Sequence, residues 1–155
     1  MTHYELSKKN VARLINQKDN LNIGHAIEMH DWESRSLQNF KRESRWQSYF
    51  TIAPKHLPRL VANAMYTIWE DIAYTMSNVH DGKPVNFDID MSFVKNKHIG
   101  IVYDHELNVK TLTKHVRVVL YWDSHGMLSV KTAYPILTDS VKRSQWKQYS
   151  KNHTA

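Results

Sequence analysis

The chain has 155 residues, of which 41% are apolar and 11% aromatic, and this suits one folded domain with an ordinary buried core. Its 21 lysines and arginines exceed its 15 aspartates and glutamates, and the net charge of +6 makes a polyanion such as RNA a natural partner. It has no cysteine, which excludes disulfides, thiolate nucleophiles and thiolate zinc sites.

The positive charge gathers toward the two ends of the chain. Residues 1–60 carry ten basic against six acidic side chains, and residues 111–155 carry seven against two. Residues 61–110 are acidic overall, with four basic against seven acidic side chains. If the ends meet in the fold, they form one positive face; a merely soluble basic protein is the alternative. No apolar run approaches the roughly 18 residues of a membrane span, and the first residues lack the apolar core of a signal peptide.

Helices are predicted in the first half of the chain. Residues 4–18 form a short basic helix, whose predicted apolar side is Leu6, Val11, Leu14 and Ile15. Residues 25–47 are polar and ambiguous, with a helix preferred. From Leu57 to Met76, apolar residues recur at helical spacing, which predicts one core helix of about five turns ending near Ser77.

Strands are predicted in the second half. Residues 85–93 alternate between apolar and polar, "HIGIVY" forms another short strand, and "HVRVVLYW" and "MLSVKTAYPIL" flank the turn "DSHG" as a hairpin. Thr138 is the predicted N-cap of a final helix. Helices first and strands later predict an α+β fold, with N-terminal helices packed on a C-terminal antiparallel sheet.

Two hydroxyl residues interrupt the apolar pattern of the last strand. Because side chains alternate along a strand, Leu128, Val130, Thr132, Tyr134 and Ile136 are predicted to share one face. An unpaired buried hydroxyl costs roughly 1–3 kcal/mol, so these two hydroxyls need partners or a ligand. The alternative is that both are ordinary strand residues at the edge of the core.

Ten histidines invite a search for acid/base or metal sites. In "GHAIEMH", His25 and His30 are five residues apart, whereas helical zinc sites favour spacings of three or four. We therefore predict no metal site and no cofactor. Either histidine can act in acid/base chemistry near neutral pH, although a surface histidine is the simpler interpretation.

Basic residues interleaved with aromatic ones indicate contacts with phosphates and bases. Lys41, Arg42 and Arg45 stand beside Phe40 and Trp46, and the tail combines the same residue types around Trp146. The alternative for both segments is a solvated helix face.

Four segments, in order, resemble a known family: "GHAIEMH", "SYFT" before the long helix, "IGIVY", and "VRVVLYWDSHGMLSVKTAYP". The chain resembles RNase A-like toxin domains, the C-terminal tips of contact-dependent growth inhibition proteins and related bacterial polymorphic toxins. The resemblance covers about residues 24–136, is most specific in the hairpin with TAYP, and leaves a basic tail at 137–155. It implies a single ribonuclease domain over 1–155, RNase A-like in fold but without disulfides.

The resemblance implies a metal-independent endoribonuclease. The RNA 2′-OH attacks the adjacent phosphorus, a cation stabilises the phosphoryl oxygens, and an acid protonates the leaving 5′-oxygen, which gives a 2′,3′-cyclic phosphate. His30 is the implied acid/base, with His25 in reserve. Arg42 is the implied phosphate-stabilising residue, with Lys41 in reserve.

The remaining implied contacts involve both hydroxyls and the basic segments. Thr132 would bind phosphate or base, and Tyr134 would orient or donate to the phosphate. The predicted RNA-binding residues are Arg35, Arg45, Trp46 and Lys131. After His30 this chain reads "DWES" where the family has VGKT, so the basic position stays open among Arg35, Lys41 and Arg42.

The implied partners are an RNA substrate, for which tRNA is one candidate, and a cognate acidic immunity protein. The implied location is the cytoplasm of a target cell, reached as part of a larger secreted or cell-surface protein. Three other functions stay open: an EndoU-like ribonuclease toxin, a nonenzymatic RNA-binding module, and an immunity or adaptor protein. The positive charge argues against the last, because immunity proteins to basic nucleases tend to be acidic.

Overall fold

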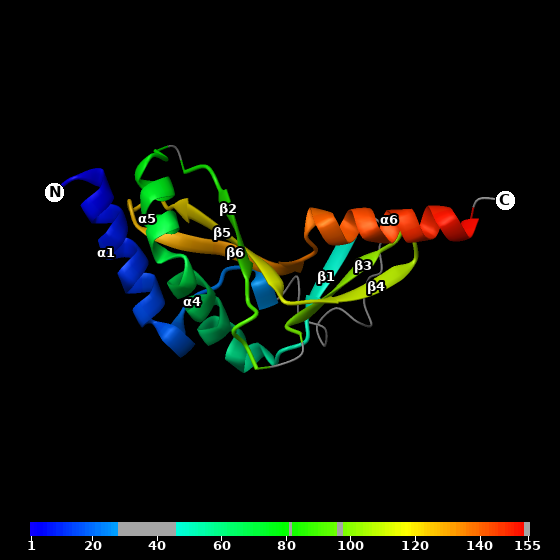
Figure 1. Ribbon diagram of the computed structural model, residues 1–155. Helices are drawn as coiled ribbons and strands as arrows, with labels where there is room; N and C mark the ends of the chain where they lie inside the picture. Colours follow the sequence, from blue (N-terminus) through cyan, green and yellow to red (C-terminus); the bar gives the residue numbers. More distant parts are fainter. Residues whose placement is uncertain (28–45, 81, 96–97, 154–155) are drawn as a thin grey trace.

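The computed structural model describes residues 1–27, 46–80, 82–95 and 98–153 of the chain (Figure 1). In these ranges the α-helices are α1 (His3–Asn16), α4 (Leu57–Thr67), α5 (Trp69–Ser77) and α6 (Asp139–His153). The same ranges contain two single-turn 3-10 helices. The first, η1 (Lys18–Asn20), follows α1, and the second, η2 (Pro54–His56), precedes α4.

Within the described residues, the strands form two antiparallel sheets of three strands each. One sheet has the order β1-β3-β4 and contains β1 (Trp46–Phe50), β3 (Gly100–Asp104) and β4 (Val109–Thr113). The other has the order β2-β5-β6 and contains β2 (Val85–Asp90), β5 (His115–Trp122) and β6 (Leu128–Ile136). The predicted α+β fold and the predicted β5-β6 hairpin are both confirmed.

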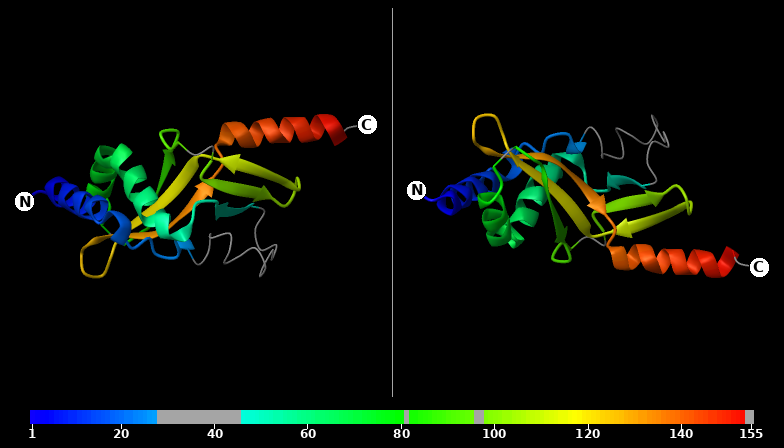
Figure 2. Two further views of the ribbon diagram at one scale, coloured as in Figure 1. Left: turned by 90° about the horizontal axis from the view of Figure 1, so that it is seen from below. Right: turned by 90° about the horizontal axis from the view of Figure 1, so that it is seen from above.

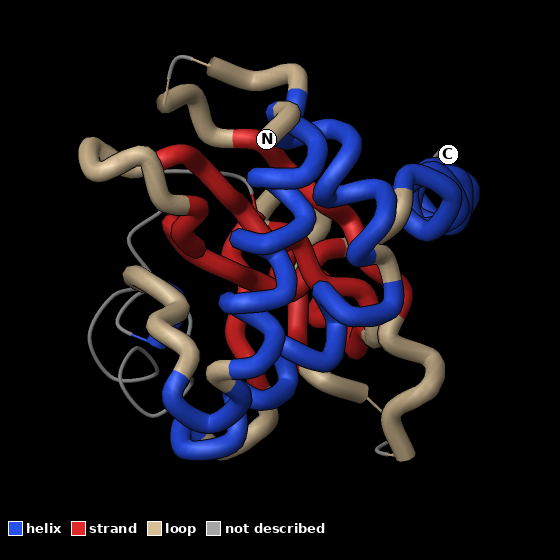
Figure 3. The backbone as a smooth tube through the Cα atoms, turned by 90° about the vertical axis from the view of Figure 1, so that its left-hand side faces the viewer, coloured by secondary structure: helices blue, strands red, loops and turns tan. Residues whose placement is uncertain are grey.

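Helices α1, α4 and α5 cover one face of the β2-β5-β6 sheet (Figure 3). The core lies between them, where Met65, Ile72, Ile89 and Leu120 are fully buried. The opposite face of this sheet carries no described helix, as the views in Figures 2 and 3 show. The sheet therefore has one apolar side that packs on the helices and a second side without a described helix.

The two ends of the chain lie far apart. Helix α1 is at one end of the molecule and α6 runs along the β1-β3-β4 sheet to the other end (Figures 1 and 2). Lys142 on α6 places its ammonium 4.8 Å from the ring centre of Trp46, and Gln145 donates a hydrogen bond to Thr111. The terminal positive charges therefore do not merge into one face.

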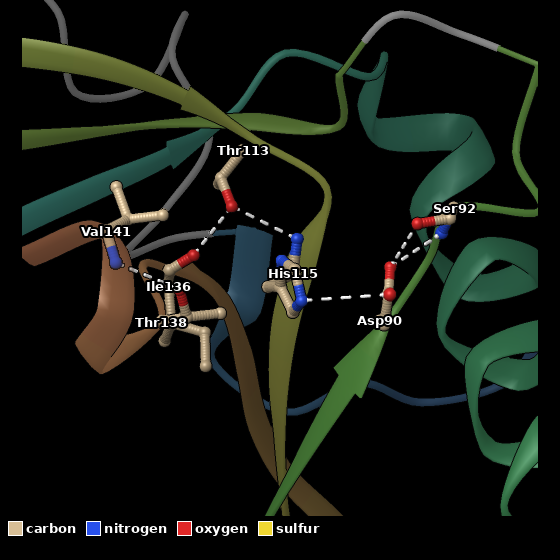
Figure 4. A network of polar contacts seen from close by, with 7 residues as sticks. All are labelled: Asp90, Ser92, Thr113, His115, Ile136, Thr138 and Val141. Carbon is tan, nitrogen blue, oxygen red and sulfur yellow. Dashed lines mark hydrogen bonds and ion pairs between the residues drawn. The ribbon is translucent and has the colours of Figure 1, made fainter. Parts of the chain in front are cut away.

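The chain passes from one sheet to the other at Lys114, the single residue between β4 and β5. The Thr113 hydroxyl holds this junction, because it donates to the carbonyl of Ile136 (2.7 Å) and accepts from the backbone N–H of His115 (3.1 Å; Figure 4). Thr138, two residues after Ile136, accepts a hydrogen bond from the N–H of Val141 at 3.3 Å. This contact confirms the predicted N-cap of α6.

Several predicted elements differ from the structure. The long core helix is two helices, interrupted at Ile68, where φ is −129° and ψ is 29°. The helix preferred for 25–47 is wrong for its last two residues, because Trp46 opens strand β1. Strand β4 was not predicted. Its residues do not alternate between buried and exposed, as the pattern of a half-buried strand requires. Phe93 lies beyond β2 and is half exposed.

Helix α1 is attached to the start of β6 by polar side chains, not by the predicted apolar side alone. Leu6 is 40% exposed, while Asn10 is buried. The Asn10 side-chain oxygen accepts from the N–H of Leu128 (3.1 Å), and Arg13 donates to the Leu128 carbonyl (2.6 Å). Both backbone groups at the start of β6 are thereby satisfied from α1.

We expect Asn10→Ala to destabilise the fold by about 2 kcal/mol, because it leaves the buried N–H of Leu128 without its acceptor. For a chain of this size the melting temperature should fall by about 4–8 °C. Asn63→Ala, at an exposed position of α4, is the matched control and should change little. Equal melting temperatures for both variants, measured by calorimetry, would show that the Asn10 bond does not hold β6.

Candidate functional site

A β-bulge in β6 decides which way its hydroxyl residues face. Val119 pairs with Thr132, but the next pair is Leu120 with Val130, so Lys131 is an extra residue in β6. An extra residue reverses the alternation of side chains beyond it. Leu128 and Val130 are buried on the helix side before the bulge, and Ala133 is buried there after it.

Thr132 and Tyr134 share a face, but the prediction that this face continues Leu128 and Val130 is wrong. Their cross-strand partners are Val119 and Arg117, which lie on the side of the sheet away from the helices. We call this side the polar face. It comprises Asn86, Asp88, Asp90, His115, Arg117, Val119, Tyr121, Ser129, Thr132, Tyr134 and Ile136.

The bulge is closed by the segment that precedes the undescribed residues. The backbone N–H of His25 donates to the carbonyl of Lys131 at 3.2 Å. Gly24 has a φ of +63°, and a Cβ there would stand 1.9 Å from the same carbonyl oxygen. Only glycine allows this approach. The backbone of Gly24 and His25 therefore packs directly on Lys131, the extra residue of β6.

A cavity of about 420 Å³ opens beside the bulge. Its volume lies within the range of small-ligand sites. Its polar lining includes His25 and the exposed Lys131, together with Tyr121 and Ser129 at the end of the polar face. The structure thus brings His25 close to β6, the strand that carries Lys131, Thr132 and Tyr134.

The centre of the polar face holds an ion pair. Arg117 Nε and one terminal nitrogen donate to the two carboxylate oxygens of Asp88, at 2.7 and 3.0 Å. The pKa of Arg117 is raised above its ordinary value, mainly by this hydrogen bond and further by the nearby Tyr134, although partial burial opposes the rise. Asp88, Arg117 and Tyr134 form one row across three strands.

The neighbouring row carries a histidine and a carboxylate. His115 Nε2 lies 3.9 Å from Asp90 (Figure 4). The pKa of Asp90 is lowered, first because the Ser92 hydroxyl donates to it, and also by the Ser92 N–H and the charge of His115. A cation and a titratable group therefore stand two residues apart on β5, on the face that carries Tyr134.

The hydroxyl of Thr132 has no hydrogen-bond partner in the part of the chain that the structure describes, and the atom is shielded from solvent. Arg13 Nε and Gln145 Oε1 are likewise buried without a hydrogen-bond partner, but these two residues belong to helices. A buried hydroxyl without a partner costs about 1–3 kcal/mol, so the position favours an occupant that supplies one.

Other predicted site residues are placed differently or fall outside the description. Trp46 lies in the other sheet, where it contacts Lys142 of α6. Five residues lie outside the described ranges: His30, Arg35, Lys41, Arg42 and Arg45. Sequence reasoning missed Asp88 and Arg117, although the alternation in "VNFDID" and "HVRVVL" already puts their polar residues on one side of each strand.

A second cavity, of about 430 Å³, lies between α1, the end of α5 and the β5-β6 turn. His3 and His80 line it, with ring centres 5.2 Å apart, and so does Asp123. Its described lining includes no lysine or arginine, which makes it a poor site for a phosphate.

The described residues contain neither a metal-binding cluster nor a membrane-spanning helix. Within residues 1–27, 46–80, 82–95 and 98–153, no three histidine, aspartate or glutamate side chains gather as a metal site would require. None of the helices in those ranges combines the length and apolar character needed to cross a membrane.

No protein-family model matches the chain, and no curated protein matches it. Among solved structures, a chain of the crystal structure of a CdiA-CT/CdiI complex from Y. kristensenii 33638 is similar, with a TM-score of 0.53 and 19% sequence identity. The match covers 74% of this chain and 100% of that chain. At this identity the similarity concerns the fold, and it supports the α+β class described above.

We expect Gly24→Ala to destabilise the protein more than Gly126→Ala. Both glycines have positive φ, where an alanine costs about 1–2 kcal/mol. A Cβ at Gly126 meets nothing within 4 Å, whereas at Gly24 it collides with the backbone of β6. Gly24→Ala should therefore cost at least about 1 kcal/mol more. Equal losses in denaturant unfolding would mean that the Gly24 segment is not bound to the bulge.

Proposed function

We propose that this chain is a metal-independent endoribonuclease toxin whose reaction takes place on the polar face beside the bulge. The observation that carries the proposal is the shielded hydroxyl of Thr132, which lacks a described partner and shares a face with Tyr134 and the cation Arg117. A phosphate oxygen supplies the acceptor that the Thr132 hydroxyl needs, and phosphate is the group that a hydroxyl pair next to a cation suits best.

The similarity to a chain of a CdiA-CT/CdiI complex supports a role in contact-dependent inhibition between bacteria. Such a complex holds two proteins, and the positive charge of this chain favours the toxin over its immunity protein. The TAYP hairpin of the resemblance is formed here by β5 and β6, with Thr132 and Tyr134 of TAYP on the side of the sheet away from the helices. Delivery by a larger protein into a target cell follows from the same role.

The mechanism needs a base, a cation and an acid around one phosphate. A base removes the proton of the RNA 2′-OH, the 2′-oxygen attacks phosphorus, and the bond to the 5′-oxygen breaks as that oxygen receives a proton. His30 is the proposed acid/base, with His25 in reserve. Thr132 and Tyr134 donate hydrogen bonds to the phosphoryl oxygens, which gain negative charge in the transition state.

The remaining proposed contacts supply charge. Arg42, with Lys41 in reserve, stabilises the transition state, and Arg35, Arg45 and Lys131 hold neighbouring phosphates. Trp46 belongs to the β1-β3-β4 sheet, so it contacts RNA only where the RNA chain extends beyond the polar face. A complementary acidic immunity protein that covers this surface protects the producing cell.

We expect RNA cleavage to continue in EDTA and to leave 2′,3′-cyclic phosphate ends, because no step uses a metal. RNA with a 2′-O-methyl group at the cleaved position should stay intact, since it lacks the nucleophile. Gel analysis with end-group mapping measures both results. Binding without cleavage would favour a nonenzymatic RNA-binding module, and activity that returns only with added Mg²⁺ would contradict the mechanism.

We expect Tyr134→Phe and Thr132→Val each to slow cleavage at least about tenfold, equivalent to about 1.4 kcal/mol of transition-state stabilisation. Each change removes a hydroxyl and keeps the shape of the side chain, so neither should lower the melting temperature, and Thr132→Val should raise it because a buried hydroxyl without a partner is removed. Tyr74→Phe, at an exposed position of α5, is the matched control and should cleave at the parent rate. Parent rates for both site variants would remove the hydroxyls from the reaction.

A further inference from the structure

Three cations form a row along the outer side of α6. Arg143, Lys147 and Lys151 follow one another at intervals of four residues, so they lie on one side of the helix with neighbouring Cβ atoms about 5–6 Å apart. All three side chains are exposed, and none makes an ion pair or a hydrogen bond within the part of the chain that the structure describes. We call these three side chains the basic row.

The opposite side of α6 determines where the basic row points. Gln145 donates a hydrogen bond to Thr111 of β4. The ammonium group of Lys142 lies 4.8 Å from the centre of the Trp46 ring in β1. Lys147 follows Gln145 by two residues, which places it about 160° farther around the helix. The basic row therefore faces away from the β1-β3-β4 sheet.

The basic row does not stabilise the helix that carries it. It contains two pairs of like charges four residues apart, and such pairs repel each other. The helix dipole favours a cation in the last turn, where Lys151 lies, but gives no such gain to Arg143 in the second turn. The sequence of α6 has one acidic residue, Asp139, against four lysines and arginines. A bound anion would supply the negative charge that the helix itself lacks.

The chemistry of the outer side of α6 favours a polyanion over a protein or a membrane. The residues beside the basic row are exposed and polar: Ser140, Ser144 and Gln148. The partly exposed Trp146 and Val141 lie about 100° or more around the helix from Lys147. A protein interface needs an apolar or aromatic centre, and a membrane-bound helix needs an apolar face. Phosphate groups need only cations.

We propose that the basic row binds the phosphate backbone of the RNA substrate at a distance from the cleaved bond. This inference rests on the proposed function, in which RNA is cleaved on the polar face. Strand β6 leads into α6 with only Leu137 and Thr138 between them, so an RNA chain that extends beyond Ile136 has the helix next to it. The basic row contributes affinity for long RNA and takes no part in bond cleavage.

The position of the basic row determines how long an RNA must be to contact all of it. Residues 135–138 span at most about 14 Å as extended chain, and α6 as far as Lys151 adds about 20 Å. The path from Tyr134 to Lys151 is therefore at most about 34 Å. At about 3.4 Å per phosphate along a helical strand, this length corresponds to about ten nucleotides.

The direct test is the binding of a 2′-O-methyl RNA of about 30 nucleotides, which cannot be cleaved, measured by fluorescence anisotropy over a range of salt concentrations. The triple variant Arg143→Gln/Lys147→Gln/Lys151→Gln should bind this RNA at least about tenfold more weakly than the parent at low salt. The slope of the logarithm of the association constant against that of the salt concentration should fall by about two, since each phosphate contact contributes about 0.7. An RNA of about six nucleotides should show a smaller loss of affinity.

A matched control separates the basic row from the net charge of the protein. Lys9→Gln/Lys18→Gln/Lys55→Gln removes three exposed cations from α1, η1 and η2, so it lowers the net charge by the same amount. Its affinity should stay within about twofold of the parent value, with the same salt slope. Circular dichroism and a melting temperature for every variant show whether the fold is intact.

Further measurements separate charge from shape and binding from catalysis. Arg143→Lys/Lys147→Arg/Lys151→Arg keeps all three charges and should bind the RNA as the parent does. With an unmodified RNA of about 30 nucleotides, the triple glutamine variant should raise KM at least about tenfold, while kcat stays within about twofold.

Distinct outcomes separate this inference from the proposed function. Parent affinity in the triple glutamine variant, or an equal loss in the matched control, would overturn the inference. A weaker affinity with an unchanged salt slope would overturn it too, because no phosphate contact would then have been lost. If the triple glutamine variant binds RNA normally but loses binding to an acidic protein, the inference is wrong and that protein is the partner of the basic row. If the parent binds RNA through the basic row but cleaves none, the proposed function fails while the basic row is still an RNA-binding surface.

Discussion

The site depends on one backbone contact, the approach of Gly24 to the carbonyl of Lys131. The hydrogen bond from the His25 N–H to that carbonyl holds the extra residue of β6 in place. Without the bulge, strict alternation would turn Thr132 and Tyr134 into the helix-packed core. With it, the strand is apolar toward the helices on both sides of Lys131 and still presents two hydroxyls on the opposite face.

Because of the bulge, the β2-β5-β6 sheet packs on the helices with one face and carries the candidate site on the other. Its helix side is closed by apolar packing and by the polar attachment of α1 to Leu128 through Asn10. Its polar face is free of that packing, and it carries the charged row of Asp88 and Arg117 that ends at Tyr134. Disulfides are not needed for this division, since burial and strand pairing achieve it.

Much of the fold follows from local patterns, because periodicity and turn chemistry act over a few residues. The hairpin around "DSHG", the helical spacing between Leu57 and Met76, and the cap at Thr138 are of this kind. The break at Ile68 and the exposed Leu6 are not, since they depend on how α4, α5 and α1 pack together. Such tertiary effects override propensity.

The candidate site was harder to predict, because its geometry depends on strand register. The TAYP segment already suggests Thr132 and Tyr134, but their face depends on a bulge that is closed by a glycine more than 100 residues earlier in the chain. Arg117 and Asp88 come together only through the pairing of β2 with β5, which leaves no mark in either segment alone. A glycine before a histidine is a weak signal until its partner strand is known.

The central claim is that RNA binds the polar face beside the bulge. The most direct measurement is the change in backbone amide NMR signals on adding a 2′-O-methyl RNA, which binds but cannot be cleaved. The largest changes should fall on Arg117, Lys131, Thr132 and Tyr134. Changes confined to α6 or to the helical side, with the polar face unaltered, would contradict it.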